Sequence, residues 1–147
     1  MSDVVFRDFQ HGDQDSCLAI FDANCPEFFA PNEREDYVSF LESNPRGYEV
    51  TVSNGALVAA FGVLSEGDGA QRLNWILLQP DAQGLGLGTA IMARSTLTAR
   101  VRGAETLHIA ASHKSAPFFE RFGAQRLVFT EHGWGPDMHR VDMALRL

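Results

Sequence analysis

The sequence has 147 residues, which fits a single domain over residues 1–147, and its 45% apolar and 21% charged residues are ordinary for a soluble globular protein. The net charge of −7 argues against non-specific binding to nucleic acid or to an anionic membrane, because both select a basic surface. Since no targeting or membrane-spanning stretch stands out, a cytoplasmic location is the expectation.

The N-terminal third predicts one strand and two helices. Residues 4–10 have strand composition, and Asp13 or Asp15 is a candidate cap for a helix that ends near Asn24. A second helix is expected after Pro31. Its start resembles an Asn version of the capping box, formed by Asn32 and Glu35. The apolar positions expected to face the core in these helices are Cys17, Leu18, Ile20, Phe21, Cys25, Tyr37, Val38 and Leu41.

The middle of the chain predicts three strands. Residues 48–52 and 57–64 flank Ser53-Asn54-Gly55, which is a strong hairpin signal. A turn at residues 66–69 leads into the strand 72–78.

The C-terminal half predicts a helix after the glycines to about Arg102, the strand 106–112, a short helix within 115–123, and the strands 124–132 and 141–147. The long helix is expected to bury a stripe of Ala90, Ala93, Leu97 and Val101. The order β-α-α-β-β-β-α-β-α-β-β indicates an α+β domain with a mixed sheet.

The metal and disulfide chemistry of this sequence is expected to be limited. Cys17 and Cys25 would lie about 12 Å apart along one helix, which is too far for a disulfide. His132 and His139 have no metal-ligand spacing with these cysteines, so no metal site is expected.

Three alternating glycines mark the stretch QPDAQGLGLGTAIM, residues 79–92, which joins a strand to a helix. Glycine costs about 0.5–1 kcal/mol relative to alanine inside a regular element, so this segment is expected to turn tightly or to admit a ligand close to the backbone. No Asp or Glu occurs from residue 84 to residue 103. A helix N-terminus without acids favours phosphate, although a tight connection without a ligand is the simpler alternative. The P-loop and dinucleotide-binding patterns both fail on residues.

One family pattern does match. Gln83-Gly84-Leu85-Gly86-Leu87-Gly88 resembles the Q/R-x-x-G-x-G/A cofactor motif of the GNAT acetyltransferases. WILLQPDAQG before it and APFFERFGA after it resemble two further segments of that family, in the family's order. Together with the element order, the resemblance covers essentially the whole chain. It implies a GNAT-like, mostly antiparallel central sheet flanked by about four helices.

The resemblance also implies a binding mode for acetyl-CoA as co-substrate. The backbone N–H groups of Gln83, Gly84, Leu85, Gly86, Leu87, Gly88 and Thr89 would bind its pyrophosphate. Ile76, Leu77 and Leu78 would pair with the pantetheine arm in a strand that is bulged in the family, and the Leu78 N–H would polarise the thioester carbonyl. Phe118 and Phe119 would lie beside this arm, and Ser112 stands where the family often has Asn.

The sequence departs from the family at two positions. Phe119 occupies the position at which the family usually has a Tyr that acts as general acid. Gln71-Arg72 occupies the region where many members carry a Glu that acts as general base. His113, at the mouth of the expected site, is the candidate proton acceptor, with water as the alternative; its other interpretation is an exposed loop residue.

The acceptor pocket is expected between two loops. Glu27, Phe28 and Phe29 lie in a loop bounded by prolines, and the family often places this loop over the acceptor. Trp134, between two glycines, either lines the same pocket or simply packs. Three carboxylates near this loop could attract an ammonium group: Glu27, Glu33 and Glu35. The alternative for each is a solvated surface charge, or, for Glu35, a helix-capping residue.

These features predict an N-acetyltransferase that moves an acetyl group from acetyl-CoA to a primary amine by direct attack. The expected acceptor is a small molecule, and the protein is expected to be a monomer or a homodimer. A protein lysine or N-terminal acetyltransferase and a non-catalytic CoA-binding module are the alternatives.

Overall fold

The computed structural model describes residues 4–82 and 86–147, and Gln83, Gly84 and Leu85 of the expected phosphate loop lie outside the described residues. Within that part of the chain, seven strands form one sheet in the order β1-β2-β3-β4-β5-β7-β6. All neighbours are antiparallel except β4 and β5. The strands are β1 (Val4–Asp8), β2 (Tyr48–Ser53), β3 (Ala56–Ser65), β4 (Gln71–Leu78), β5 (Thr106–Ser112), β6 (Gln125–Gly135) and β7 (Met138–Arg146).

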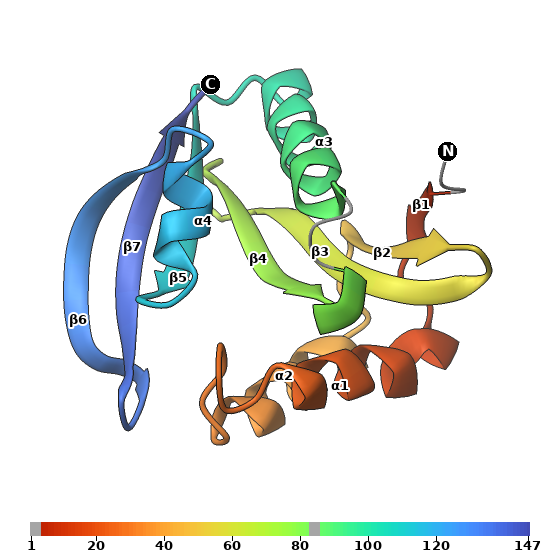
Figure 1. Cartoon of the computed structure of the whole chain (residues 1–147). Helices are drawn as coiled ribbons and strands as arrows, with labels where there is room; N and C mark the ends of the chain where they lie inside the picture. The colour runs from red at the N-terminus through yellow and green to blue at the C-terminus, as the bar shows by residue number, and fades with distance from the viewer. Residues whose placement is uncertain (1–3, 83–85) are drawn as a thin grey trace.

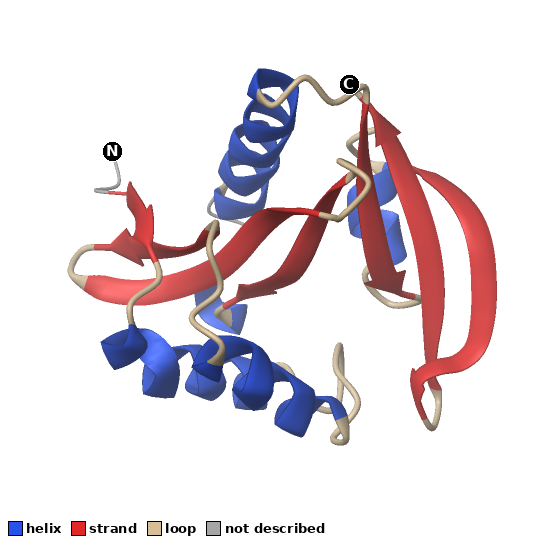
Figure 2. Cartoon of the chain, turned by 180° about the vertical axis from the view of Figure 1, so that it is seen from behind, coloured by secondary structure: helices blue, strands red, loops and turns tan. Residues whose placement is uncertain are grey.

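Helices cover both faces of this sheet. They are α1 (Gln14–Ala23), α2 (Glu33–Glu42), α3 (Leu87–Val101) and α4 (Ala116–Glu120), with short 3₁₀ turns at His11–Asp13 and Pro80–Ala82. Helices α1 and α2 lie together below the sheet, and α3 lies above it (Figures 1 and 2). The expected element order and the α+β fold with a mixed, mostly antiparallel sheet are confirmed.

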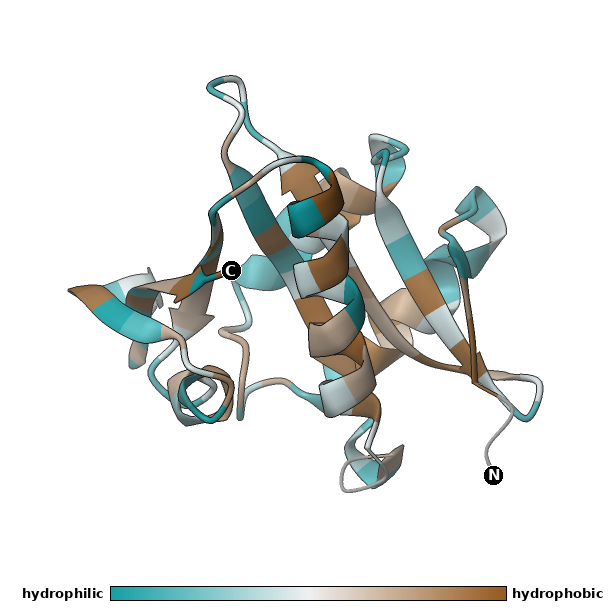
Figure 3. Ribbon diagram, turned by 90° about the horizontal axis from the view of Figure 1, so that it is seen from above, coloured by the Kyte–Doolittle hydropathy of each residue, from teal (hydrophilic) through white to brown (hydrophobic). Residues whose placement is uncertain are grey.

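Each face of the sheet carries its own apolar core. Below the sheet, Phe21, Tyr37 and Leu41 pack against Tyr48 and Leu77 of the strands. Above it, the buried residues of α3 and α4 pack against the other faces of β3, β4, β5 and β7, with α3 laid across the strands (Figure 3). Two independent cores leave the sheet itself as the shared layer between them.

The hairpin between β2 and β3 forms as its turn residues predict. Asn54 and Gly55 both have positive φ, at 52° and 81°. This is the pattern of a type I′ turn, whose twist matches that of the flanking strands.

The expected buried stripe of α3 is wrong. Leu97 is 59% exposed and Val101 is 79% exposed, and Ala93 is also exposed. The residues that face the sheet are Leu87, Ile91, Met92, Ser95 and Ala99. Ser95 fits this apolar face because its hydroxyl donates to the Ile91 carbonyl oxygen at 2.7 Å within the helix.

The expected capping box of α2 is also wrong. Asn32 makes no side-chain cap; instead its Nδ2 donates to the carbonyl oxygen of Trp134 at 2.8 Å. Glu33, rather than Glu35, takes up a backbone N–H before the helix, that of Ala30, also at 2.8 Å. The residue before this helix therefore contacts the distant β6–β7 hairpin instead of capping the helix.

Candidate active site

The sheet opens between β4 and β5. The two strands pair over only three positions, from Gln71 opposite Leu107 to Leu73 opposite Ile109, and then diverge (Figure 1). A cavity of about 640 Å³ occupies this opening. Its walls include residues of β4, β5 and α4, the first turn of α3, the α1–α2 loop and the β6–β7 hairpin.

A bulge in β4 bends the strand at this opening. Ala60 of β3 pairs with Leu77 and Gly62 pairs with Asn74, so Phe61 faces two residues, Trp75 and Ile76. Trp75 has φ of 44°, a left-handed conformation that non-glycine residues seldom adopt. The bulge that the family resemblance implied is therefore confirmed.

The surroundings of Trp75 hold this backbone in place. The hydroxyl of Tyr48 donates to the Trp75 carbonyl oxygen at 2.6 Å. The indole lies 4.7 Å, centroid to centroid, from the Tyr37 ring, and it also stacks on Phe29 at 6.1 Å. A strained conformation persists only when its environment specifies it, and here a partly buried hydrogen bond and aromatic packing do so.

The Leu78 backbone is directed away from β3. The Gln79 N–H donates to the Val58 carbonyl oxygen at 2.8 Å, so Leu78, one residue earlier, belongs to a pair that makes no ladder bonds with β3. Consistently, its carbonyl oxygen accepts a hydrogen bond of 2.9 Å from the Nδ2 of Asn24 instead. The Leu78 N–H accordingly faces the opening between β4 and β5, the direction required of a donor to a bound thioester.

The described part of the glycine stretch forms the start of α3. Gly86 is the N-cap residue with φ of 81°, and its carbonyl oxygen accepts from the N–H of Ala90. The N–H groups of Leu87, Gly88 and Thr89 lie in the first helical turn, where they have no partner within the helix. Of these residues, Gly88 lines the cavity.

Helix α4 packs its aromatic residues against this turn. A Cβ on Gly88 would lie only 2.7 Å from Cε1 of Phe118, so glycine here lets the ring approach. Phe118, the buried Phe119 and Ser112 all line the cavity. Ser112 also has a structural task, since its Oγ accepts the Ser115 N–H at 3.0 Å before α4. Together with Gly88 and the β4 residues Ile76, Leu77 and Leu78, these residues surround one space.

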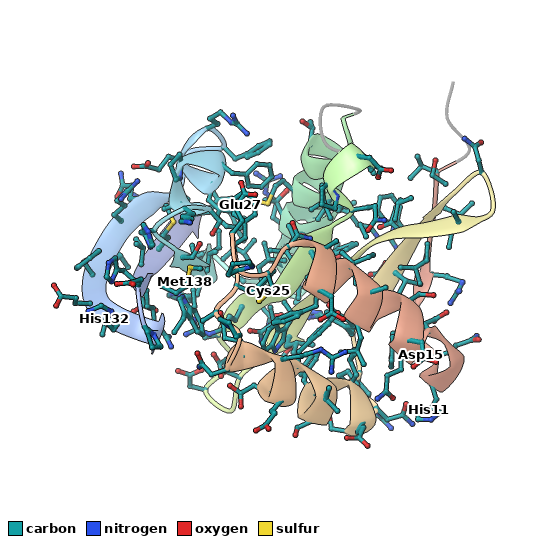
Figure 4. The ribbon with its side chains drawn as sticks, turned by 60° about the horizontal axis from the view of Figure 1, so that its bottom comes forward. His11, Asp15, Cys25, Glu27, His132 and Met138 are labelled. Carbon is teal, nitrogen blue, oxygen red and sulfur yellow. The ribbon has the colours of Figure 1, made fainter. Side chains whose placement is uncertain are left out.

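The acceptor loops also meet at this cavity. Phe28, Phe29 and Trp134 line it, whereas Glu27, labelled in Figure 4 in the α1–α2 loop, is exposed and does not belong to the described lining. The Nε1 of Trp134 donates to the Ala111 carbonyl oxygen at 2.9 Å.

The two loops touch each other at one end of the cavity. Asn32 Nδ2 donates to the Trp134 carbonyl oxygen, and a Cβ on Gly135 would lie 2.8 Å from the Cβ of Ala30. The α1–α2 loop and the β6–β7 hairpin therefore bridge this end of the cavity.

Glu33 is the site residue whose environment the sequence did not reveal. It is only 5% exposed and lines the cavity, although the sequence suggested a solvated charge. Burial raises its pKa to about 7, and a hydrogen bond from the Ala30 N–H opposes this increase. The available signal was its position in the first turn of a helix beside a loop already expected to cover the acceptor.

His113 lies in a different environment from the other expected site residues. Its Nδ1 accepts a hydrogen bond of 3.1 Å from the N–H of His139, and the two rings are 4.7 Å apart. The described residues that line the cavity include its neighbours Ser112 and Lys114 but not His113 itself. His132, at the outer end of β6, continues this histidine cluster away from the cavity (Figure 4).

The charged groups around the cavity differ between its two sides. Lys114 and Arg121 line it from the β5–α4 turn and the end of α4, on the side where α3 also begins. Glu33 lines it from the α1–α2 side of the sheet. One end is therefore suited to an anion and the other to a cation.

Metal-binding clusters and membrane-spanning helices are absent from residues 4–82 and 86–147. In these residues, no cluster of three or more His, Cys, Asp or Glu side chains is arranged to hold a metal ion. No helix in the same residues combines the length and apolar character needed to cross a membrane. Cys17 and Cys25 are both free thiols.

Comparison with known proteins identifies similar chains. The sequence model described as the acetyltransferase (GNAT) family matches residues 17–124. No curated protein is significantly similar.

Solved structures share the fold at low sequence identity. A GNAT-family protein from Desulfovibrio desulfuricans is 22% identical with a TM-score of 0.76, over 97% of this chain and 98% of that one. The ribosomal-protein-S18-alanine N-acetyltransferase from Escherichia coli is 18% identical with a TM-score of 0.78, over 97% and 93%. An aminoglycoside 6'-N-acetyltransferase, solved with coenzyme A, is 13% identical with a TM-score of 0.72, over 97% and 96%.

Proposed function

Because the chain belongs to the GNAT acetyltransferase family, we propose that it transfers the acetyl group of acetyl-CoA to the primary amine of a small molecule. The observation that carries this proposal is the cavity between β4 and β5, with Lys114 and Arg121 on one side and Glu33 on the other. An anionic cofactor and a cationic acceptor would enter from opposite faces of the sheet and meet at Leu78.

Acetyl-CoA is assigned to the side of α3 and α4. The N–H groups of the first turn of α3 and the two cations favour its phosphates. The pantetheine arm would run along Ile76, Leu77 and Leu78 between the strands. Phe118 and Phe119 would flank it, while Ser112 would contact it from β5. The backbone N–H groups of three further residues would bind the same phosphates: Gln83, Gly84 and Leu85.

The chemistry requires a donor for the developing oxyanion. The Leu78 N–H is directed into the opening, and the Asn24 hydrogen bond to the Leu78 carbonyl oxygen holds that strand end. A positioned backbone donor stabilises the tetrahedral intermediate without reorganising during the reaction. Holding amine and thioester together supplies a further part of the rate. His113 can act as proton acceptor only through a relay, since it does not line the cavity described here.

The bridged loops favour a small acceptor over a protein chain. A protein lysine or N-terminus needs an open groove, whereas Asn32 and Trp134 join the two loops at the acceptor end of this cavity. Phe28, Phe29 and Trp134 would line the acceptor pocket.

The test is thiol release from acetyl-CoA with a panel of small primary amines and with lysine-containing and N-terminal peptides. Release that depends on a small amine, with the acetylated amine found by mass spectrometry, is the expected result. Release with peptides alone would favour the protein acetyltransferase. CoA binding without release for any acceptor would favour the non-catalytic module.

A further inference from the structure

Glu33 is a buried carboxyl group that takes no part in the acetyl transfer proposed so far. It is the first residue of α2 and is 5% exposed. Its Oε2 accepts a hydrogen bond of 2.8 Å from the Ala30 N–H, which fixes the carboxyl group in the wall of the cavity. A buried charge without a counter-ion is costly, so its retention in a cavity suggests that a cation occupies the space beside it.

We propose that Glu33 receives the ammonium group of the acceptor and takes its proton, so that the substrate is a small alkyl amine that enters as a cation. This inference rests on the proposed acetyl transfer and adds to it a proton acceptor and a substrate class.

The proposed step moves one proton from the ammonium ion to Glu33 and a second one to the departing thiolate. The ammonium ion R–NH₃⁺ gives one proton to the Glu33 carboxylate and becomes R–NH₂, whose lone pair attacks the thioester carbonyl carbon. The C–N bond forms as the carbonyl electron pair moves to oxygen, facing the Leu78 N–H. That pair then returns and the C–S bond breaks. The second nitrogen proton passes to the departing thiolate, which gives the amide and CoA–SH, and Glu33 releases its proton to water.

The environment of Glu33 suits this proton transfer. An alkylammonium ion has a pKa near 10.4, about six units above an ordinary Glu near 4.3. Burial raises the Glu33 pKa to about 7 and narrows that gap to about three units. A general base works best when its pKa lies near the working pH, because it is then both ionised and sufficiently basic.

Other ionisable groups around Glu33 reinforce its role. Asp36, on the same helix, raises the Glu33 pKa further, after the larger effect of burial. Cys25 is the neighbouring thiol in the α1–α2 loop, and its own pKa is raised chiefly by burial, and also by Asp22 and Glu33. Lys114 and Arg121 line the cavity from the α4 side and would face the cofactor.

The aromatic walls fit the same kind of substrate. Phe28, Phe29, Trp75 and Trp134 line the cavity with Glu33. Aromatic faces attract an ammonium group and pack well against a short hydrocarbon chain. An acceptor that carries a carboxylate next to its amine would instead bring a second negative charge toward Glu33.

The test compares two kinds of amine. An alkyl amine is protonated at pH 7 and needs a base, whereas an arylamine is already neutral. Glu33→Gln keeps the size of the side chain and an oxygen that can accept the Ala30 N–H. Glu35→Gln changes an exposed carboxyl group in the same helical turn and is the matched control. Steady-state kcat and KM are measured from about pH 5 to 9 for both amines, with the thermal shift caused by CoA recorded for each variant.

The expected loss in kcat/KM for Glu33→Gln with the alkyl amine is about 10²-fold or more, since removing a general base typically costs 10²–10⁴-fold. With the arylamine the loss should be only a few-fold. The rise in rate through pH 7 should disappear, CoA should still raise the melting temperature, and Glu35→Gln should match the wild type in every measurement.

Either of two results with Glu33→Gln would overturn the proposal. Equal losses for both amines with an unchanged pH profile would limit Glu33 to a positioning role. A normal rate for Glu33→Gln would remove it from the reaction. Wild-type protein that binds CoA but acetylates neither amine would refute the proposed function itself. If Glu33→Gln does not fold, Glu33→Asp decides instead. Because this variant retains a carboxyl group, its rate should still rise with pH, and a rate that does not rise would contradict the proposal.

Discussion

The side-chain nitrogen Nδ2 of Asn24 donates a hydrogen bond of 2.9 Å to the carbonyl oxygen of Leu78, 54 residues later in the chain. The same nitrogen donates to Ile20, also at 2.9 Å, and Asn24 is only 5% exposed. The end of α1 is thus joined to the strand end that carries the proposed oxyanion donor.

Asn24→Ala should lower both stability and turnover. One buried carbonyl group, that of Ile20, and one partly buried carbonyl group, that of Leu78, would lose this donor, which costs about 1–3 kcal/mol, and the Leu78 strand end would be less well fixed. The measurement is urea unfolding together with kcat for one good amine and the affinity for CoA. We expect kcat to fall more than CoA affinity. Loss of stability with an unchanged kcat would show that the bond serves the fold alone.

CoA and acetyl-CoA should raise the melting temperature. A ligand at 100 times its dissociation constant stabilises the folded state by about 2.7 kcal/mol. ATP and NAD should do much less, because they carry phosphates but no pantetheine arm to lie along β4. Differential scanning fluorimetry at matched ligand concentrations makes this comparison, and equal stabilisation by ATP would contradict the assignment.

Gly86→Val and Gly88→Val should weaken CoA binding at least tenfold, or about 1.4 kcal/mol, for different reasons. Gly86 has φ of 81° with open space around it, so its substitution strains the backbone of the N-cap. Gly88→Val would drive a side chain into the ring of Phe118. Titration calorimetry on folded variants measures the effect.

A paired substitution separates crowding from phosphate contact at Gly88. Gly88→Ala alone should destabilise the protein by about 1–3 kcal/mol, as overpacking does. Adding Phe118→Leu should restore part of this stability by making room. An unchanged CoA affinity in folded Gly86→Val would argue against the α3 phosphate site.

Two substitutions test the remaining proton-transfer candidates. Phe119→Tyr restores the hydroxyl group that the family usually places near the sulfur. It should change the rate less than about tenfold, because a thiol of pKa near 8.5 leaves as thiolate at pH 7 for only about 2 kcal/mol. A larger gain would show that an acid is needed. The pH–rate profile with one amine is the measurement.

His113→Ala should retain the rate of the wild type to within about tenfold, because His113 does not line the described cavity and accepts the His139 N–H. If His113 were the base, its loss would cost 10²–10⁴-fold and would remove a rise in rate near pH 6.5. That result would transfer the role of proton acceptor from Glu33 to His113.

Glu33 should make the stability of the protein pH-dependent. Burial raises its folded-state pKa from 4.5 to about 7. The folded protein therefore binds the Glu33 proton more tightly than the unfolded chain does. The stability that this protonation contributes is fully present below about pH 4.5 and is lost as the pH rises through 7. Glu33→Gln should consequently be more stable than the wild type at pH 8, by about 1–3 kcal/mol, and similar to it near pH 5. Melting curves at the two pH values measure the difference, and a constant difference would contradict the buried ionisation.

Several features of this protein could be predicted because they are encoded locally. The order of the elements followed from hydrophobic periodicity and from glycine and proline positions. The Asn54-Gly55 turn formed as expected, since its positive φ angles are a property of those two residues. The family resemblance, which depended on the glycine motif and the segment order, predicts a bulge in this strand but not its position at Trp75.

Other features were decided by tertiary contacts, which leave no local signal. Helix α3 has small and apolar residues all around it, so its periodicity could not show that Ile91 and Ala99, rather than Leu97 and Val101, face the sheet. The contrast between Glu27 and Glu33 has the same origin. Both lie near the same loop, but Glu33 is buried because the chain around Asn32 and Ala30 meets the hairpin at Trp134 and Gly135, about 100 residues later. Burial raises the pKa of a carboxyl group only where distant segments exclude water, so the sequence determined which elements form, while packing between them determined which carboxyl group faces the cavity.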